Sequence, residues 1–275
     1  MTAGWPAIAA ARRFDAATRV PFTVAGRAVG SVARSHLPVL RHWPKWLRVK
    51  ADGVTLTAQD RDTALAAIHA ALRAEGLILA WRDEIFPLFD PATLEPLARI
   101  ERAASRFWGT LTLGAHANGF VADAAGRPTH LWIARRSAHK ATDPGLFDNL
   151  VGGGVPAGQS PFEALIREAW EEAGLTPGQM AHATPGRVIR LRREIPEGLQ
   201  VEELHGFDLA LPAGCVPQNQ DGEVERFDLL PVADALALAA GNTMTVDAAL
   251  VTLDFGLRHG LLTAPPGADV LLGAI

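Results

Sequence analysis

Three glutamates in the second half of the chain have types and spacing that suit metal chemistry. They are Glu168, Glu171 and Glu172, and they fall in a predicted helix between Ser160 and Gly174. Because a helix advances about 100° per residue, the three carboxylates share one face. Crowded carboxylates repel one another, whereas Mg²⁺ and Mn²⁺ prefer oxygen ligands. The pattern therefore has two interpretations, a solvated acidic helix face or a site for a divalent cation.

The neighbouring segments can hold these glutamates in place. A glycine-rich loop begins at Gly152 and leads into the helix. Ser160 is the expected N-cap, Pro161 occupies the first helical position, and Gly174 ends the helix. The apolar residues gather on the other face of the helix and are expected to pack on a sheet. They are Phe162, Ile166, Ala169, Trp170 and Ala173.

This stretch resembles the Nudix box, G-x5-E-x7-R-E-U-x-E-E-x-G-U, in which U is an aliphatic residue. Gly153 aligns with the first glycine of the box. The end of the box is matched by Arg167, Glu168, Ala169, Glu171, Glu172, Gly174 and Leu175. The one departure is the loop glutamate, where this chain has Gln159.

The resemblance implies roles for the matched residues. The Gly153 carbonyl and the three glutamates would hold Mg²⁺ or Mn²⁺, and Arg167 would orient a glutamate. Gln159 cannot form an ion pair with Arg167. Glu163 lies one helical turn before Arg167, at a spacing that favours ion pairs, and our hypothesis is that it replaces the loop glutamate.

Other stretches resemble the Nudix domains related to thiamine pyrophosphokinase. These stretches are residues 131–137, 146–154, 221–225 and 253–260. Members of that group carry an N-terminal domain of about this length and often lack the loop glutamate. The resemblance implies a diphosphatase that hydrolyses thiamine diphosphate, or its oxy and oxo analogues, to the monophosphate. Within such an enzyme, metal ions would neutralise the phosphates and activate the attacking water.

Residues outside the box are further candidates, each with an alternative. Glu223 would complete the metal shell or take a proton from water, or lie on a solvated strand edge. Arg135 and Arg136 end a predicted strand and would bind phosphate oxygens, unless they form a solvated turn. Trp132 would stack on a heterocycle or belong to the core. Residues 202–203, both glutamates, are predicted to be a surface pair.

The bulk composition limits the class of partner. The 275 residues carry 26 Lys and Arg against 30 Asp and Glu, a formal charge of −4. This balance disfavours nucleic acid and anionic membranes as partners. The family resemblance implies that the partner is a small diphosphate molecule, and we expect the protein to be a monomer or a homodimer. Cys215 is the single cysteine, which excludes an internal disulfide. With no signal-peptide pattern and no apolar stretch of about 20 residues, we predict a cytoplasmic protein.

The order of elements predicts an α+β chain in two parts. Residues 1–108 form a smaller α+β accessory domain, and residues 109–275 form a Nudix α/β/α sandwich with a mixed sheet. Predicted helices are 12–20, 62–74, 93–107, 231–240 and 246–258; predicted strands are 21–29, 54–58, 77–81, 110–122, 128–135, 147–151, 187–195 and 200–209. The tail with Pro265 and Pro266 is read as a terminal extension.

Two other functions compete with the thiamine interpretation. The same box would serve a hydrolase of ADP-ribose, NADH or a nucleoside triphosphate, because specificity resides in loops. A Nudix-like module that binds a metabolite without cleaving it is the second alternative, and Gln159 is its only support. The intact set of three helix glutamates argues against that module.

Overall fold

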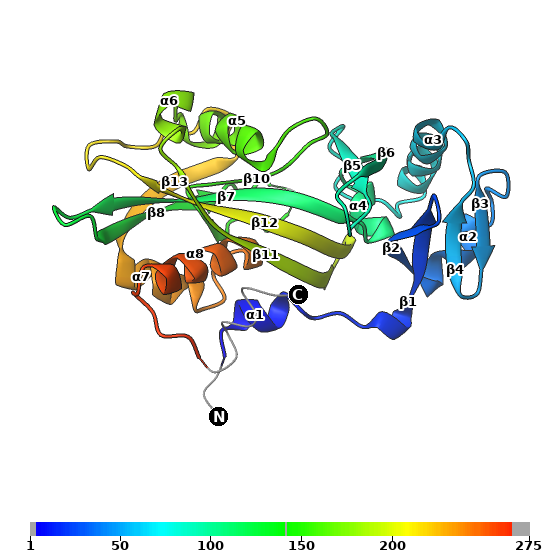
Figure 1. The fold of residues 1–275 in the computed structure, drawn as a ribbon, viewed down its shortest axis with the longest axis horizontal. Coiled ribbons are helices and arrows are strands. Elements are labelled where there is room, and N and C mark those ends of the chain that lie inside the picture. Colours follow the sequence, from blue (N-terminus) through cyan, green and yellow to red (C-terminus); the bar gives the residue numbers. More distant parts are fainter. Residues whose placement is uncertain (1–3, 141, 266–275) are drawn as a thin grey trace.

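A seven-stranded mixed sheet forms the centre of the larger part of the protein. The computed structural model describes residues 4–140 and 142–265 (Figure 1). The main strand order is β11-β12-β7-β8-β13, with β10 paired to β7 and β9 paired to β8. Strand β12 runs parallel to β7, whereas β7 and β8 form an antiparallel hairpin. The strands are β7 (Leu111–Ala122), β8 (Pro128–Arg136), β9 (Phe147–Asp148), β10 (Val151–Gly154), β11 (Thr184–Ile195), β12 (Gly198–Ala210) and β13 (Val224–Pro231).

Helices cover both faces of this sheet, which gives an α/β/α sandwich (Figure 1). One face carries α5 (Pro161–Ala173) and α6 (Pro177–Met180), and the other carries α7 (Val232–Ala239) and α8 (Val246–Arg258). Successive residues of a strand point to opposite faces, so β8 contributes to two cores. Leu131 and Ile133 pack with α7 and α8, while Trp132 packs on the side of α5.

The preceding residues build a second, smaller α+β unit. Its sheet has the order β2-β1-β4-β3 and contains β1 (Arg19–Val24), β2 (Arg27–Ala33), β3 (Leu47–Lys50) and β4 (Gly53–Leu56). The other elements are η1 (Ala16–Thr18), η2 (Arg34–His36), α2 (Leu37–Leu40), α3 (Arg61–Ala74), the hairpin β5 (Ile85–Phe89) and β6 (Pro96–Glu101), and α4 (Ala104–Trp108). Trp108 is fully buried and stacks on Phe22 at 4.2 Å between ring centroids. This core anchors the segment that leads into β7.

The first described residues pack on the larger sandwich. Helix α1 (Pro6–Ala10) buries Ile8 in the cluster that contains α7 and α8. The backbone then hydrogen-bonds to the edge strand β11, where Glu194 N–H donates to the Arg13 carbonyl at 2.9 Å. The predicted division of the chain at residues 108 and 109 stays a prediction.

Four of the predicted elements were wrong. Residues 21–29 form the hairpin of β1 and β2 instead of one strand. Residues 93–107 form β6 and the short α4 instead of one helix, because Leu94 has a left-handed φ of 58° and Ile100 pairs with Phe86 across a hairpin. Residues 77–81 are irregular instead of a strand. The helix predicted at 12–20 is replaced by α1 and η1. The helices at 62–74 and 246–258 and the hairpin of β7 and β8 are confirmed.

Pro266, half of the predicted proline tail, lies outside the described residues. Within residues 4–140 and 142–265, no helix combines the length and the apolar character that a membrane crossing requires.

Candidate active site

Helix α5 is fixed at both ends by local sequence. The Ser160 hydroxyl accepts the Glu163 N–H at 3.3 Å, and the Glu163 carboxylate accepts the Ser160 N–H at 2.8 Å, so the two form a capping box. Gly174 ends the helix with a left-handed φ of 65°. The hypothesis that Glu163 pairs with Arg167 was therefore wrong, because its carboxylate caps the helix.

The buried face of α5 differs from the predicted one. Trp170 is 52% exposed, whereas Leu165 is fully buried. The buried face also includes Glu172, which is only 5% exposed. The orientation of the helix about its axis therefore differs from the predicted one. Part of its acidic face lies against the sheet, and Trp170 lies in solvent.

The carboxylates on the buried side of α5 contact the glycines of β10. Gly152 N–H donates to Glu172 Oε2 at 3.0 Å. A Cβ atom at Gly153 would lie 2.3 Å from Cδ of Glu168, far below van der Waals contact. Glu168 therefore lies directly against the strand, and only glycine at position 153 leaves room for it.

Two cations lie among the carboxylates. Arg167 donates to Glu168 at 2.8 Å and to Glu171 at 2.7 Å. Lys140 Nζ lies 3.4 Å from Glu172 Oε1 and also pairs with Glu223, so it connects the helix to the segment before β13. The structure therefore brings Glu223 close to the box residues. The sequence alone gave Lys140 no role in the site.

Burial dominates the electrostatics of these carboxyl groups. It raises the pKa of Glu172 to about 8, against the opposing charge of Lys140. Burial also raises the pKa of Glu168, although Arg167 and Arg102 oppose the shift. Burial acts in the same direction on Glu223, but the bond to Lys140 outweighs it and the pKa of Glu223 is lowered. A nearby divalent cation would favour the ionised form of all three groups.

The donor set fits a hard divalent cation. The predicted set consists of carboxylate oxygens on one helix and the Gly153 carbonyl, and the missing side chain at Gly153 leaves room for the Glu168 carboxylate. Within the described residues, no three acidic, histidine or cysteine side chains already converge as a cation cage. Arg167 and Lys140 lie between the carboxylates instead. A metal ion at this site would compete with these internal ion pairs.

The three residues predicted to bind substrate lie in different environments. Arg136 donates to Asp148 at 2.7 Å and lines a cavity beside the glycine strand. Arg135 lies over the Phe147 ring at 4.8 Å, and its Nε has no partner among the described residues. Trp132 is 6% exposed and belongs to the core under α5, away from that cavity.

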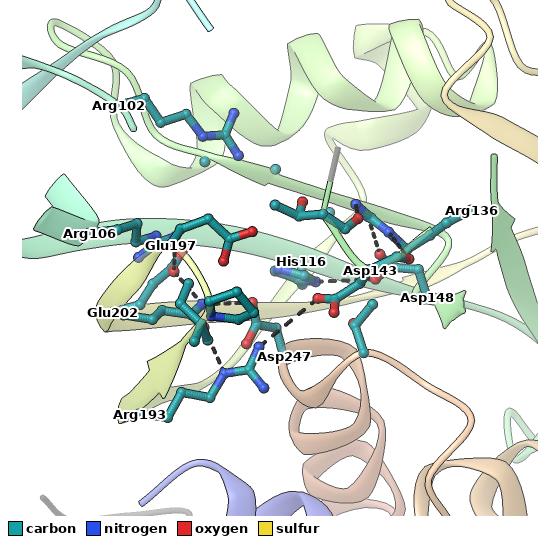
Figure 2. A pocket seen from close by; sticks show the side chains of 18 of the residues that line it. Arg102, Arg106, His116, Arg136, Asp143, Asp148, Arg193, Glu197, Glu202 and Asp247 are labelled. Carbon is teal, nitrogen blue, oxygen red and sulfur yellow. Dashed lines mark hydrogen bonds and ion pairs between the residues drawn. The ribbon is translucent and has the colours of Figure 1, made fainter. Parts of the chain in front are cut away.

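The cavity has a volume of about 440 Å³ and borders β10 at Gly152, Gly153 and Gly154. Its wall combines both signs of charge, and Figure 2 shows Arg102 and Arg106 at one end with Arg136 and Asp148 at the other. The side chains of the three helix glutamates are not part of this wall, so the glycine strand is the boundary between the cavity and the carboxylates. A volume of this size suits a small molecule.

The prediction that Glu202 and Glu203 form a surface pair was wrong. Glu202 is 7% exposed and pairs with Arg106 at 3.1 Å, while Glu203 is 5% exposed and pairs with Arg190 at 2.7 Å. Both lie in β12, an inner strand of the sheet between β11 and β7. These two glutamates are buried because of the position of their strand in the sheet, and a local sequence pattern does not indicate that position.

An acidic pair lies deep in the cavity wall. Gln200 Nε2 donates to Glu202 at 2.8 Å and to Asp247 Oδ2 at 3.1 Å. The other oxygen of Asp247 has no hydrogen-bond partner among the described residues. Burial, together with the negative charge of Glu202, raises the pKa of Asp247. An N–H donor on a bound molecule would satisfy this oxygen.

We expect Asp247→Asn to stabilise the protein. Because the folded state raises the pKa of Asp247, it binds this proton more tightly than the unfolded state does, and stability is lost as pH rises above about 3.8. The amide has the same shape and removes this cost, so we expect a gain of about 1 kcal/mol near pH 7 and a Tm increase of about 2–4 °C. Thermal unfolding at pH 4 and pH 7 measures the effect, which should grow with pH.

The matched control for this prediction is Asp234→Asn, because Asp234 is an exposed acid in the first turn of α7. It should leave Tm unchanged or slightly lower through the helix dipole. A lower Tm for Asp247→Asn than for the wild type would contradict the prediction.

Comparison with known proteins covers nearly the whole chain. Residues 112–248 match the model of the NUDIX domain, and residues 6–112 match a domain of unknown function, DUF4743. Nudix hydrolase 20, chloroplastic, of Arabidopsis thaliana is 32% identical over 88% of this chain and 68% of its own length. Nudix hydrolase 24, chloroplastic, of the same plant is 33% identical over the same shares. Among solved structures, DR0079 from Deinococcus radiodurans is 24% identical, with a TM-score of 0.47 over 62% of this chain and 98% of that one.

Proposed function

Because the chain belongs to the Nudix hydrolase family, we propose that it is a Mg²⁺- or Mn²⁺-dependent enzyme that hydrolyses a small molecule containing a diphosphate bond. The observation that carries the proposal is the contact of Glu168 and Glu172 with the glycines of β10. This contact supports the proposal because both carboxylates lie against the glycine strand, and the same strand borders a cavity of molecular size.

We assign a different role in the reaction to each group of site residues. Glu168, Glu171, Glu172 and the Gly153 carbonyl would hold the metal, which supplies charge neutralisation and Lewis acidity when bound. Arg167 bonds both Glu168 and Glu171 and sets the orientation of these two carboxylates. Glu223, or one of the helix carboxylates, would accept the proton of the attacking water. Arg136 lies within reach of the cavity and stabilises phosphate charge there, with Arg135 as the weaker candidate.

We assign the substrate as thiamine diphosphate or its oxy and oxo analogues. The resemblance to thiamine pyrophosphokinase-related Nudix domains suggests this class, and the character of the cavity agrees with it. Arginines lie near the glycine strand, where a diphosphate would bind, and the unpartnered oxygen of Asp247 suits an amino group or a cationic ring. The products would be the monophosphate and inorganic phosphate.

A substrate panel tests the assignment. Thiamine diphosphate, its oxy and oxo analogues, ADP-ribose, NADH and nucleoside triphosphates are each incubated with the protein and Mg²⁺, and released phosphate or monophosphate is measured. We expect the thiamine compounds to be cleaved with the highest kcat/KM. If ADP-ribose or NADH is cleaved preferentially, the proposed diphosphatase activity stands and the thiamine assignment is rejected. If no compound of the panel is cleaved, the activity and the assignment are both rejected.

Removal of the divalent metal should abolish turnover without unfolding the protein. EDTA in excess is expected to reduce the rate to background, because the ion would supply the Lewis acidity and much of the charge neutralisation that the reaction requires. Added Mg²⁺ or Mn²⁺ should restore the rate, while circular dichroism stays unchanged throughout. Full activity after chelation would contradict the assigned metal role.

A further inference from the structure

Arg102 belongs to the smaller N-terminal unit, and its side chain lies at the candidate site. It follows β6 and precedes α4, and its neighbours Ala103 and Ala104 are buried in the core of that unit. Its guanidinium carbon lies 3.4 Å from the place that a Cβ atom of Gly154 would occupy. Figure 2 shows Arg102 beside the glycine strand. A packed backbone therefore holds this cation at the boundary between the cavity and the carboxylates of α5.

The guanidinium is only partly used by the protein itself. Arg102 Nη1 donates to Glu84 at 2.9 Å, and the group lies over the Phe86 ring at 5.4 Å. Its Nε and Nη2 have no hydrogen-bond partner in residues 4–140 and 142–265, and the side chain is 34% exposed. By contrast, Arg106 is already paired with Glu202 and is 18% exposed. Arg102 thus retains two N–H groups for a ligand.

The position of Arg102 is unfavourable for metal binding alone. The carboxylates of Glu168 and Glu202 are close enough to act on its charge. A fixed cation beside Glu168 repels a divalent cation held by the same carboxylate. An anionic group bound between the two cations removes that repulsion and gains bonds from both. A guanidinium also matches the two oxygens of a phosphate group.

We propose that Arg102 binds a phosphate group of the substrate, so that the N-terminal unit is a working part of the substrate site. The proposal rests on the diphosphatase function proposed above. It adds to that function a residue that binds the diphosphate from the cavity side. Because Arg102 holds the phosphate in the ground state as well as during the reaction, its loss should affect KM more than kcat.

Direct binding of inorganic diphosphate tests this proposal without turnover. Isothermal titration calorimetry in EDTA compares the wild-type protein with Arg102→Gln, Arg102→Lys and Arg99→Gln. We expect Arg102→Gln to raise the Kd for diphosphate at least tenfold, and Arg102→Lys to restore part of the loss. Arg99 is an exposed arginine on the same strand β6, so Arg99→Gln is the matched control and should leave the Kd unchanged.

Two further measurements separate ligand binding from a structural role. If Arg102 served only to bind Glu84, Glu84→Gln would weaken diphosphate binding as much as Arg102→Gln does. On our proposal Glu84→Gln frees the guanidinium, so diphosphate binds as tightly as before or more tightly. Arg102→Gln should also leave the Kd for Mn²⁺ unchanged or lower, since it removes a like charge beside Glu168.

The outcomes distinguish this proposal from the proposed function. Diphosphate binding that depends on Arg102, in a protein that hydrolyses no diphosphate, would reject the proposed function and retain the binding residue. Hydrolysis that requires Glu172, together with wild-type KM and diphosphate affinity in Arg102→Gln, would retain the enzyme and overturn this proposal. Equal losses in Arg102→Gln and Arg99→Gln, or no diphosphate binding by the wild type, would also overturn it.

Discussion

Glu172→Gln is expected to lower kcat by about three orders of magnitude while the protein stays folded. Glu172 would hold the metal, and losing several kcal/mol of charge stabilisation in the transition state costs a rate factor of this size. The fold should tolerate the change because glutamine has the same shape and its Oε1 can accept the Gly152 N–H. Burial already raises the pKa of Glu172 to about 8, so a neutral group suits this position. Steady-state kinetics and thermal unfolding measure the two effects.

Glu163→Gln is the matched control for that prediction. Glu163 lies on the same helix, but its carboxylate caps the N-terminus, and glutamine also supports a capping box. This variant should retain wild-type kcat and metal affinity. The account of the site would be rejected if Glu172→Gln hydrolysed substrate at the wild-type rate.

Gly153→Ala is expected to reduce kcat/KM by about a hundredfold, because a displacement of about 1 Å in a catalytic group costs this much. The new methyl group would meet the Glu168 carboxyl, whose Cδ lies 2.3 Å away from it. The side chain of Glu168 can rotate away from the strand, so the cost falls on the position of the carboxylate more than on stability. We expect a rise in the Kd for Mn²⁺ of at least tenfold with little change in Tm.

Gly214→Ala controls for the loss of a glycine. A Cβ atom at Gly214 meets nothing within 4 Å, so this variant should match the wild type in kcat/KM and in Mn²⁺ affinity. Unchanged kinetics in Gly153→Ala would mean that the contact between Glu168 and the glycine strand has no part in the reaction.

Local sequence was sufficient for the elements whose ends are marked by caps. The Ser160 cap, Pro161 and Gly174 predicted the ends of α5 because capping depends on residues within one turn. The same reasoning failed at residues 93–107, where pairing of Ile100 with Phe86 overrode the helical period. Burial was also harder to predict than secondary structure. Trp170 is exposed and Glu202 is buried because neighbouring elements, not the local pattern, determine which surfaces are covered.

The box gave the candidate carboxylates, but most of their partners come from elsewhere in the chain. Lys140 follows β8, and Arg102 belongs to the N-terminal unit. Neither residue stands at a spacing that relates it to the helix glutamates, and only the sheet topology brings them together. Arg136 was the exception, because a basic residue at the end of a strand next to the box is visible in the sequence. The assignments of site residues stay predictions until variants are measured.

The most direct measurement of the central claim is the binding of Mn²⁺ followed by electron paramagnetic resonance. The free-ion signal falls as Mn²⁺ binds, so titration gives the Kd without any substrate. The account predicts binding by the wild type, a Kd raised at least tenfold in Glu172→Gln and Gly153→Ala, and no increase in Arg102→Gln. Equal Mn²⁺ affinity in the wild type and Glu172→Gln would contradict the claim that the α5 carboxylates and the glycine strand form the metal site.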